Sequence, residues 1–205
     1  THSNGNLFSD DQSASVDLSK YRHLSAAPSK PRDVRSQHFL IHTDVSDRDA
    51  QILVDTLETM IVLVSNYFGR LPSGILECYV VRDLQQWPAG LIPPDAVAKI
   101  SEPAGVTISV RAGNVTKSIV YSCDKVGVVQ HEAVHAYCQQ TFGDTGPTWY
   151  AEGLAEMGHY WKKDQLAVEI DPVVINYLKN SPPKKMLDIV AAGQITGDSW
   201  QAYAW

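Results

Sequence analysis

Residues 130 to 137, QHEAVHAY, place two histidines four positions apart with a glutamate between them. On a helix, residues i and i+4 project from the same face, so His131 and His135 can both direct a ring nitrogen at one metal ion. Glu132 would lie on the adjacent edge, where its carboxylate can contact a metal-bound water without ligating the metal. The alternative is a helix that carries two histidines by chance, with a solvated Glu132. A metal site needs a third ligand.

Three positions are candidates for that ligand. The metzincin pattern H-E-x-x-H-x-x-G-x-x-H requires glycine at position 138 and histidine at position 141, but the chain has Cys138 and Thr141. Cys138 is on the same stripe of the helix but one turn further along, so it is expected in the core. Glu152, in TWYAEGLAE, follows a glycine-containing turn and can supply an oxygen if the second helix folds back on the first. Glu152 is therefore the preferred third ligand.

The second helix carries further polar residues at helical spacing. Glu156 follows Glu152 by four positions, so we expect it to accept a hydrogen bond from the other nitrogen of a ligand histidine. His159 could face the same site, although a partly buried helix histidine is the simpler interpretation. Small residues would let the two helices approach closely: Ala151, Gly153 and Ala155.

HEAVH followed by WYAEGLAE resembles the zinc site of gluzincin metallopeptidases, the group that includes thermolysin and aminopeptidase N. WYAEGLA is similar to the W-x-x-E-G-x-A motif of the aminopeptidase-N branch and of small bacterial peptidase MA-like domains. The resemblance implies a thermolysin-like fold and a Zn²⁺ ion bound by His131, His135 and Glu152. It also implies that Glu132 acts as general base on a zinc-bound water during peptide-bond hydrolysis.

The resemblance also limits the expected activity. The exopeptidase motif G-x-M-E-N is missing from the sequence, so we expect an endopeptidase acting on a peptide or protein substrate. Tyr177 and Tyr203 are candidate second donors to the oxyanion, or ordinary packing residues. The segment AGVTISV is either a sheet edge that binds extended substrate or a core strand. The alternative function is a metal-binding but catalytically inactive peptidase-like domain that acts as a binding module, although the retention of Glu132 argues against it.

Outward from this motif, the hydrophobic pattern predicts strands and helices in a mixed order. Strands are expected at HFLIH (38–42), ILECYVVRD (75–83), AGVTISVRAG (104–113), KSIVYSC (117–123) and LAVEI (166–170). Helices are expected over 47–68, 126–142, 148–163 and 172–179, with the start of another at SWQAYAW (199–205). LQQWPAGLIPPD (84–95) is expected to be an irregular loop. This order predicts an α+β fold with a small mixed sheet packed on a helical layer.

Composition bounds the class of protein. The 205 residues carry a net charge of −6 without a Lys/Arg cluster, which argues against nucleic acid as a partner, and the apolar runs are too short to span a membrane. Residues 1–35 are predicted to be a tail or linker and 36–205 the metallopeptidase-like domain, either whole or truncated at its C-terminus. The N-terminus looks processed, which favours a secreted or periplasmic protein. Cys78, Cys123 and Cys138 are expected to be buried or free thiols, with a Cys78–Cys123 disulfide as the alternative.

Overall fold

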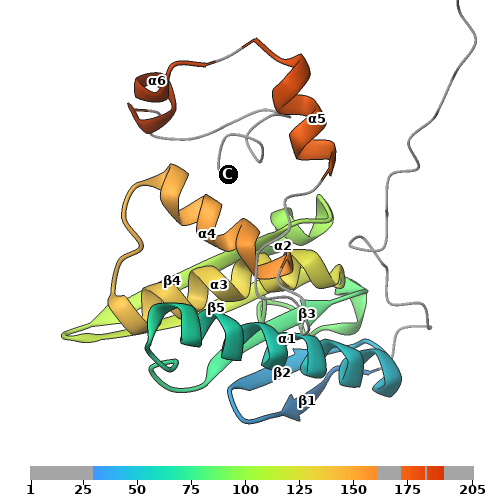
Figure 1. The fold of residues 1–205 in the computed structure, drawn as a ribbon. Helices are drawn as coiled ribbons and strands as arrows, with labels where there is room; N and C mark the ends of the chain where they lie inside the picture. Colours follow the sequence, from blue (N-terminus) through green and yellow to red (C-terminus); the bar gives the residue numbers. More distant parts are fainter. Residues whose placement is uncertain (1–29, 161–171, 183, 192–205) are drawn as a thin grey trace, which may run out of the picture.

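The computed structural model describes residues 30–160, 172–182 and 184–191, and within them it has a mixed α+β fold built on one five-stranded sheet (Figure 1). The strand order is β1-β2-β3-β5-β4. The three central strands β2, β3 and β5 are parallel, and β1 and β4 lie antiparallel at the two edges. The strands are β1 (Arg32–Arg35), β2 (Phe39–Thr43), β3 (Leu76–Val81), β4 (Gly105–Ala112) and β5 (Val115–Cys123). The expected α+β class and the small mixed sheet are confirmed.

The first strand lies inside the segment expected to be a tail. Arg32 to Arg35 pair with β2 in the register Arg32↔Thr43 and Arg35↔Leu40. The sequence RDVR has only Val34 as an apolar residue, so hydrophobic pattern alone does not predict this edge strand. The folded region therefore begins at least four residues before the expected boundary at 36.

Helix α1 (Asp47–Phe68) covers one face of the sheet with the expected bounds. It begins after Ser46, whose hydroxyl accepts a hydrogen bond from the Asp49 N–H, and it ends at Gly69, which adopts the left-handed conformation. Its inward stripe is fully buried, and each such side chain contributes about 1.5–3 kcal/mol of hydrophobic stabilisation. The residues of this stripe are Leu53, Leu57, Met60, Ile61 and Val64.

Helix α3 (Val126–Phe142) lies between the sheet and helix α4 (Thr148–Tyr160) (Figure 1). Because both sides are covered, even its polar Gln130 and Glu132 are buried. Gly158 of α4 meets α3 so closely that a Cβ there would lie 2.6 Å from Val134 Cγ2. The expected helix at 126–142 is confirmed, and the described part of α4 ends at Tyr160.

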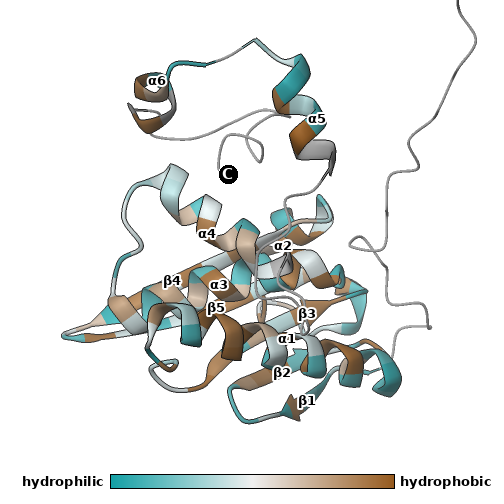
Figure 2. Cartoon of the chain, viewed as in Figure 1, coloured by the Kyte–Doolittle hydropathy of each residue, from teal (hydrophilic) through white to brown (hydrophobic). Residues whose placement is uncertain are grey.

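The opposite face of the sheet is covered by a helix that was not predicted. The short 3₁₀ helix η2 (Leu84–Gln86) lies in the stretch 84–95 that was expected to be an irregular loop. Helix α2 (Pro94–Ser101) begins at the end of that stretch and continues into residues for which no element was predicted. Pro94 begins α2, and Ala96 and Ile100 are buried one turn apart in a second hydrophobic cluster with Trp87. At eight residues the helix is too short for a convincing hydrophobic period. Figure 2 shows hydrophobic residues along the central strands, which lie between the two clusters.

The C-terminal part contains α5 (Pro172–Asn180) and α6 (Met186–Ala191). The expected helix over 172–179 is confirmed, and α6 was not predicted. The expected strand LAVEI (166–170) and the helix start at SWQAYAW (199–205) lie outside the described residues. Among the described helices, none combines the length and apolar character needed to cross a membrane.

The three cysteines are buried free thiols. Cys78 on β3 lies opposite Val120, whereas Cys123 lies opposite Val81, so the two cysteines are out of register on neighbouring strands. The alternative of a Cys78–Cys123 disulfide is therefore wrong.

Candidate metal centre

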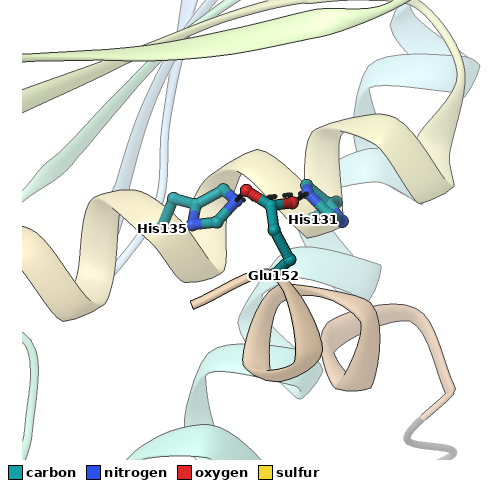
Figure 3. A group of neighbouring side chains, drawn as sticks. All are labelled: His131, His135 and Glu152. Carbon is teal, nitrogen blue, oxygen red and sulfur yellow. Dashed lines mark hydrogen bonds and ion pairs between the residues drawn. The ribbon is translucent and has the colours of Figure 1, made fainter. Parts of the chain in front are cut away.

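The fold brings together three side chains that sequence analysis assigned to a metal. His131 and His135 project from α3 toward α4, and Glu152 projects from α4 back toward α3 (Figure 3). Their potential ligand atoms all lie within 4.8 Å of one another, and they form the one such His/Cys/Asp/Glu group found among the described residues. The expected two-helix arrangement is therefore present.

The distances show a carboxylate shared between two imidazoles. Glu152 Oε2 lies 3.2 Å from His131 Nε2, and Glu152 Oε1 lies 3.6 Å from His135 Nε2 (Figure 3). The two Nε2 atoms are 3.2 Å apart. Each histidine thus directs its Nε2 atom at the carboxylate of Glu152.

The other nitrogen of His131 is held by a second carboxylate. Glu156 Oε1 lies 3.1 Å from His131 Nδ1, and the Glu156 side chain is only 1% exposed. The i, i+4 spacing puts Glu152 and Glu156 on the same face of α4, one at each nitrogen of His131. A buried carboxylate at Nδ1 fixes the orientation of the ring and directs Nε2 toward the shared point.

This environment favours positive charge. Burial by itself lowers the pKa of His131, but hydrogen bonds to Glu152 and Glu156 and the charges of Glu156 and Glu132 outweigh it and raise that pKa to about 10. Burial likewise opposes ionisation of Glu152, yet the hydrogen bonds with His131 and His135 hold its pKa well below the usual range. At neutral pH a proton on His131 supplies the charge that these carboxylates attract.

The donor set fits a metal cation in the place of that proton. Two imidazole nitrogens and one carboxylate oxygen converge, and this combination of ligands suits zinc. Glu156 already holds Nδ1 of one histidine, as partners behind metal-ligating histidines commonly do. A cation at the convergence point would relieve the close approach of two imidazole nitrogens.

Glu132 lies next to this group but faces another element. Its side chain is directed toward β4, where Thr107 Oγ1 lies 2.9 Å from Glu132 Oε2. The residue is 8% exposed. Glu132 is thus a buried carboxylate beside the histidines, on the edge of α3 where the sequence placed it.

The remaining candidates are distributed differently. Cys138 is buried in the main core, where burial raises the pKa of its thiol to about 12, so it stays protonated and is a poor ligand. Tyr177 lies in α5 with 36% of its surface exposed. Tyr203 and the side chain of His159 lie outside what the structure describes. A second donor to the oxyanion thus stays a prediction.

Strand β4 passes beside α3 as the outer strand of the sheet. Strand β4 pairs antiparallel with β5, and Ala104 O accepts a hydrogen bond from Cys123 N. In such a ladder, Ala104 and every second residue after it on β4 exchange hydrogen bonds with β5. The intervening residues Gly105, Thr107 and Ser109 therefore direct their main-chain N–H and C=O groups away from β5. The segment AGVTISV thus forms an edge strand of the described sheet, and the binding of an extended substrate along it stays a prediction.

Two contacts of Glu132 were missed by sequence analysis. Thr107 and Gly105 belong to the AGVTISV segment, but neither was singled out. They lie more than twenty positions before Glu132 in the chain, and no motif connects them to it. Only the packing of β4 on α3 brings these residues together.

Comparison with known proteins adds no identification: no protein-family model matches this sequence, and no curated protein matches it.

Proposed function

We propose that this chain is a zinc-dependent peptidase of the gluzincin type that cleaves internal peptide bonds. The observation that carries the proposal is the convergence of His131, His135 and Glu152, with the carboxylate of Glu132 beside them on the same helix. A chance pair of helix histidines would not need a facing carboxylate from α4. Nor would it need the buried Glu156 behind one ring.

His131, His135 and Glu152 would hold the zinc ion. When bound with three protein ligands, zinc supplies a nucleophilic water at neutral pH and polarises the carbonyl of the substrate. Glu152 and Glu156, placed at the two nitrogens of His131, keep the ring oriented toward the ligand position. This side chain therefore needs no rearrangement to present Nε2.

Glu132 would act as the general base. In peptide hydrolysis a carboxylate accepts the proton of the attacking water and then delivers it to the leaving amine. Glu132 lies next to the ligand His131 in sequence but is directed toward β4, so its carboxylate does not compete for the ligand position. Its burial strengthens the electrostatic interactions of the carboxylate, because water is largely excluded around it.

The edge of β4 would bind the substrate backbone. Gly105, Thr107 and Ser109 direct main-chain groups to the side of β4 that faces away from β5, which no other described strand pairs with, and an extended peptide can add there by β-pairing. Such pairing binds the main chain of the substrate along several residues and does not require a free terminus of the substrate. This supports an endopeptidase acting on extended peptide segments.

The test is to measure zinc content and hydrolysis of an unstructured protein and of a quenched peptide library. Wild-type protein should bind one zinc ion, lose activity on chelation and regain it when zinc is restored. Glu132→Gln should keep the zinc and lose about 10²–10⁴-fold in kcat. His135→Ala should lose the zinc itself.

The outcomes separate the proposal from its alternative. A correctly folded wild-type protein that does not bind zinc would overturn the metal site. Bound zinc with no hydrolysis of any library member would instead favour a catalytically inactive, metal-binding module. Glu102→Gln, an exposed glutamate on the surface, serves as the matched control and should change neither zinc content nor kcat.

A further inference from the structure

We propose that Thr107 is a positioning residue that holds the carboxylate of Glu132 for proton transfer, an inference that rests on the proposed function. Thr107 Oγ1 lies 2.9 Å from Glu132 Oε2 and 2.8 Å from the Glu132 carbonyl oxygen. The hydroxyl has one proton to donate, so the two acceptors share it in a three-centre arrangement. One side chain thus contacts both the main chain and the carboxylate of the same residue.

This contact leaves the two carboxylate oxygens of Glu132 in different roles. Oε2 accepts from Thr107, so rotation of the carboxylate is restrained, and Oε1 is left to take the proton of the attacking water. A buried carboxylate without such a partner would sample several orientations. Preorganised hydrogen bonding of this kind lowers the reorganisation needed at the moment of reaction.

Gly105 provides the room for this arrangement. A Cβ at position 105 would lie 2.7 Å from Glu132 Cγ and 3.0 Å from Val128 Cγ1. Strand β4 therefore approaches α3 about as closely as a residue without a side chain permits. Two residues along the same face of the strand, Thr107 is then within hydrogen-bonding distance of Glu132.

Thr107 also connects the base to the outer edge of the described sheet. Its side chain faces α3, while its own main-chain N–H and C=O point to the outer side of β4. A peptide paired with this edge would bind the main chain of Thr107 while the hydroxyl of Thr107 holds Glu132. The residue therefore sets the position of the base relative to the bound backbone.

The first test compares two substitutions that differ in one functional group. Thr107→Val keeps the shape and removes the hydroxyl, whereas Thr107→Ser keeps the hydroxyl. Thr107→Val should lower kcat about 10- to 100-fold with KM within about twofold of wild type, and Thr107→Ser should stay within about threefold in kcat. Both variants should bind zinc as wild type does. Thr116→Val on β5 is the control and should leave kcat unchanged.

The pattern of kinetic effects decides the role. Wild-type kcat in Thr107→Val would overturn the proposal, as would equal losses in Thr107→Ser and Thr107→Val or a change confined to KM. In a Glu132→Gln background, Thr107→Val should have little further effect on kcat, because the carboxylate that it positions is gone. If Thr107→Val lowers kcat by the same factor in the Glu132→Gln background as in wild type, the proposal is also overturned.

A second readout does not depend on activity. In denaturant unfolding of the metal-free protein, Thr107→Val should lower the folding equilibrium constant about fivefold, the value of one ordinary hydrogen bond. In a Glu132→Ala background, Thr107→Val should lower the folding equilibrium constant only about twofold, because only the carbonyl acceptor remains. Thr107→Val and Glu132→Ala, alone and combined, form a double-mutant cycle. If their effects on the folding equilibrium constant are additive, the proposed contact is overturned. If the zinc-bound wild type cleaves nothing, the proposed function fails, and this cycle still decides whether Thr107 holds Glu132.

Discussion

At the level of single residues, the charge of His131 is set by the carboxylates around it. Glu152 and Glu156 lie at its two nitrogens, and together with Glu132 they stabilise positive charge on the ring. The same carboxylates that raise the pKa of His131 would stabilise a divalent cation. The residues in direct contact with a cation and those behind them therefore act as one electrostatic unit.

Glu156→Gln tests the carboxylate behind His131. The amide keeps the size of the side chain and removes its charge, so we expect zinc affinity to fall about 10- to 100-fold. Competition with a chromophoric chelator measures this affinity. The exposed Glu102→Gln variant should bind zinc as wild type does. Unchanged affinity in Glu156→Gln would mean that Glu156 only fills space.

At the level of elements, the site depends on how closely α4 packs on α3. Gly158 allows that approach, and Gln130 Nε2 donates to Gly158 O at 3.2 Å across the same interface. The ligands come from both helices, so their separation is set by this packing. A change in helix spacing far from the histidines should therefore affect metal binding.

Gly158→Ala tests this coupling. The new Cβ would lie 2.6 Å from Val134 Cγ2 and 3.2 Å from the Gln130 carbonyl oxygen, so we expect destabilisation of about 1–3 kcal/mol and weaker zinc binding. Denaturant unfolding and chelator competition measure the two effects. Val134→Ala in the same chain removes the closest clash, so Gly158→Ala should cost less in that background. An equal cost in both backgrounds would contradict the clash.

A second element contact links α1 to the segment before β2. Glu58 accepts hydrogen bonds from the Ser36 hydroxyl at 2.5 Å and from the His38 N–H at 2.8 Å. Partial burial opposes its ionisation, but these hydrogen bonds and the interaction with the His38 ring outweigh burial and lower the pKa of Glu58. The contact therefore favours the charged form of Glu58 in the folded protein.

Glu58→Gln tests the resulting pH dependence. A carboxyl group with a lowered pKa in the folded state stabilises the protein above pH 4.5, its ordinary pKa, and this contribution is lost as the pH falls through the folded-state value. Wild type should be more stable than Glu58→Gln near pH 6, and the difference should shrink as the pH falls below 4.5. Denaturant unfolding of both proteins across this range measures it. A difference that is constant with pH would contradict the ionic contribution.

At the level of the whole molecule, the hydrophobic core is built without the side chains of the candidate metal centre. The main hydrophobic cluster unites α1, α3, α4 and the inner face of the sheet, and it includes none of the three ligands. We therefore expect the chain to fold without metal, unlike small zinc domains whose core is too small. The metal should add stability to a structure that is already formed.

Removal of metal tests this separation. The metal-free protein should keep its secondary structure and unfold cooperatively. Zinc at about 100 times its dissociation constant adds about 2.7 kcal/mol, which corresponds to a rise of roughly 5 to 10 °C in Tm for a protein of this size. Thermal unfolding followed by circular dichroism measures the shift. His135→Ala should show no such shift, and an unfolded metal-free wild type would contradict the prediction.

Residues that act through local spacing were predictable. The apolar period and caps define α1 to the residue, and the i, i+4 spacing of His131 and His135 places both rings on one face. The pairing with Glu152 and the place of Glu156 also follow from two helices joined by a short turn. These features depend on residues near one another in the chain.

Features that depend on distant residues were not predictable. The strand at Arg32–Arg35 has one apolar residue, and α2 is too short for a clear period, so each is stabilised mainly by the sheet that it joins. The contacts of Thr107 and Gly105 with Glu132 join a strand to a helix with no shared pattern in sequence. The sequence by itself thus determined which side chains can bind a metal. The tertiary structure decided which strand passes beside the glutamate, because that depends on how the sheet packs against α3.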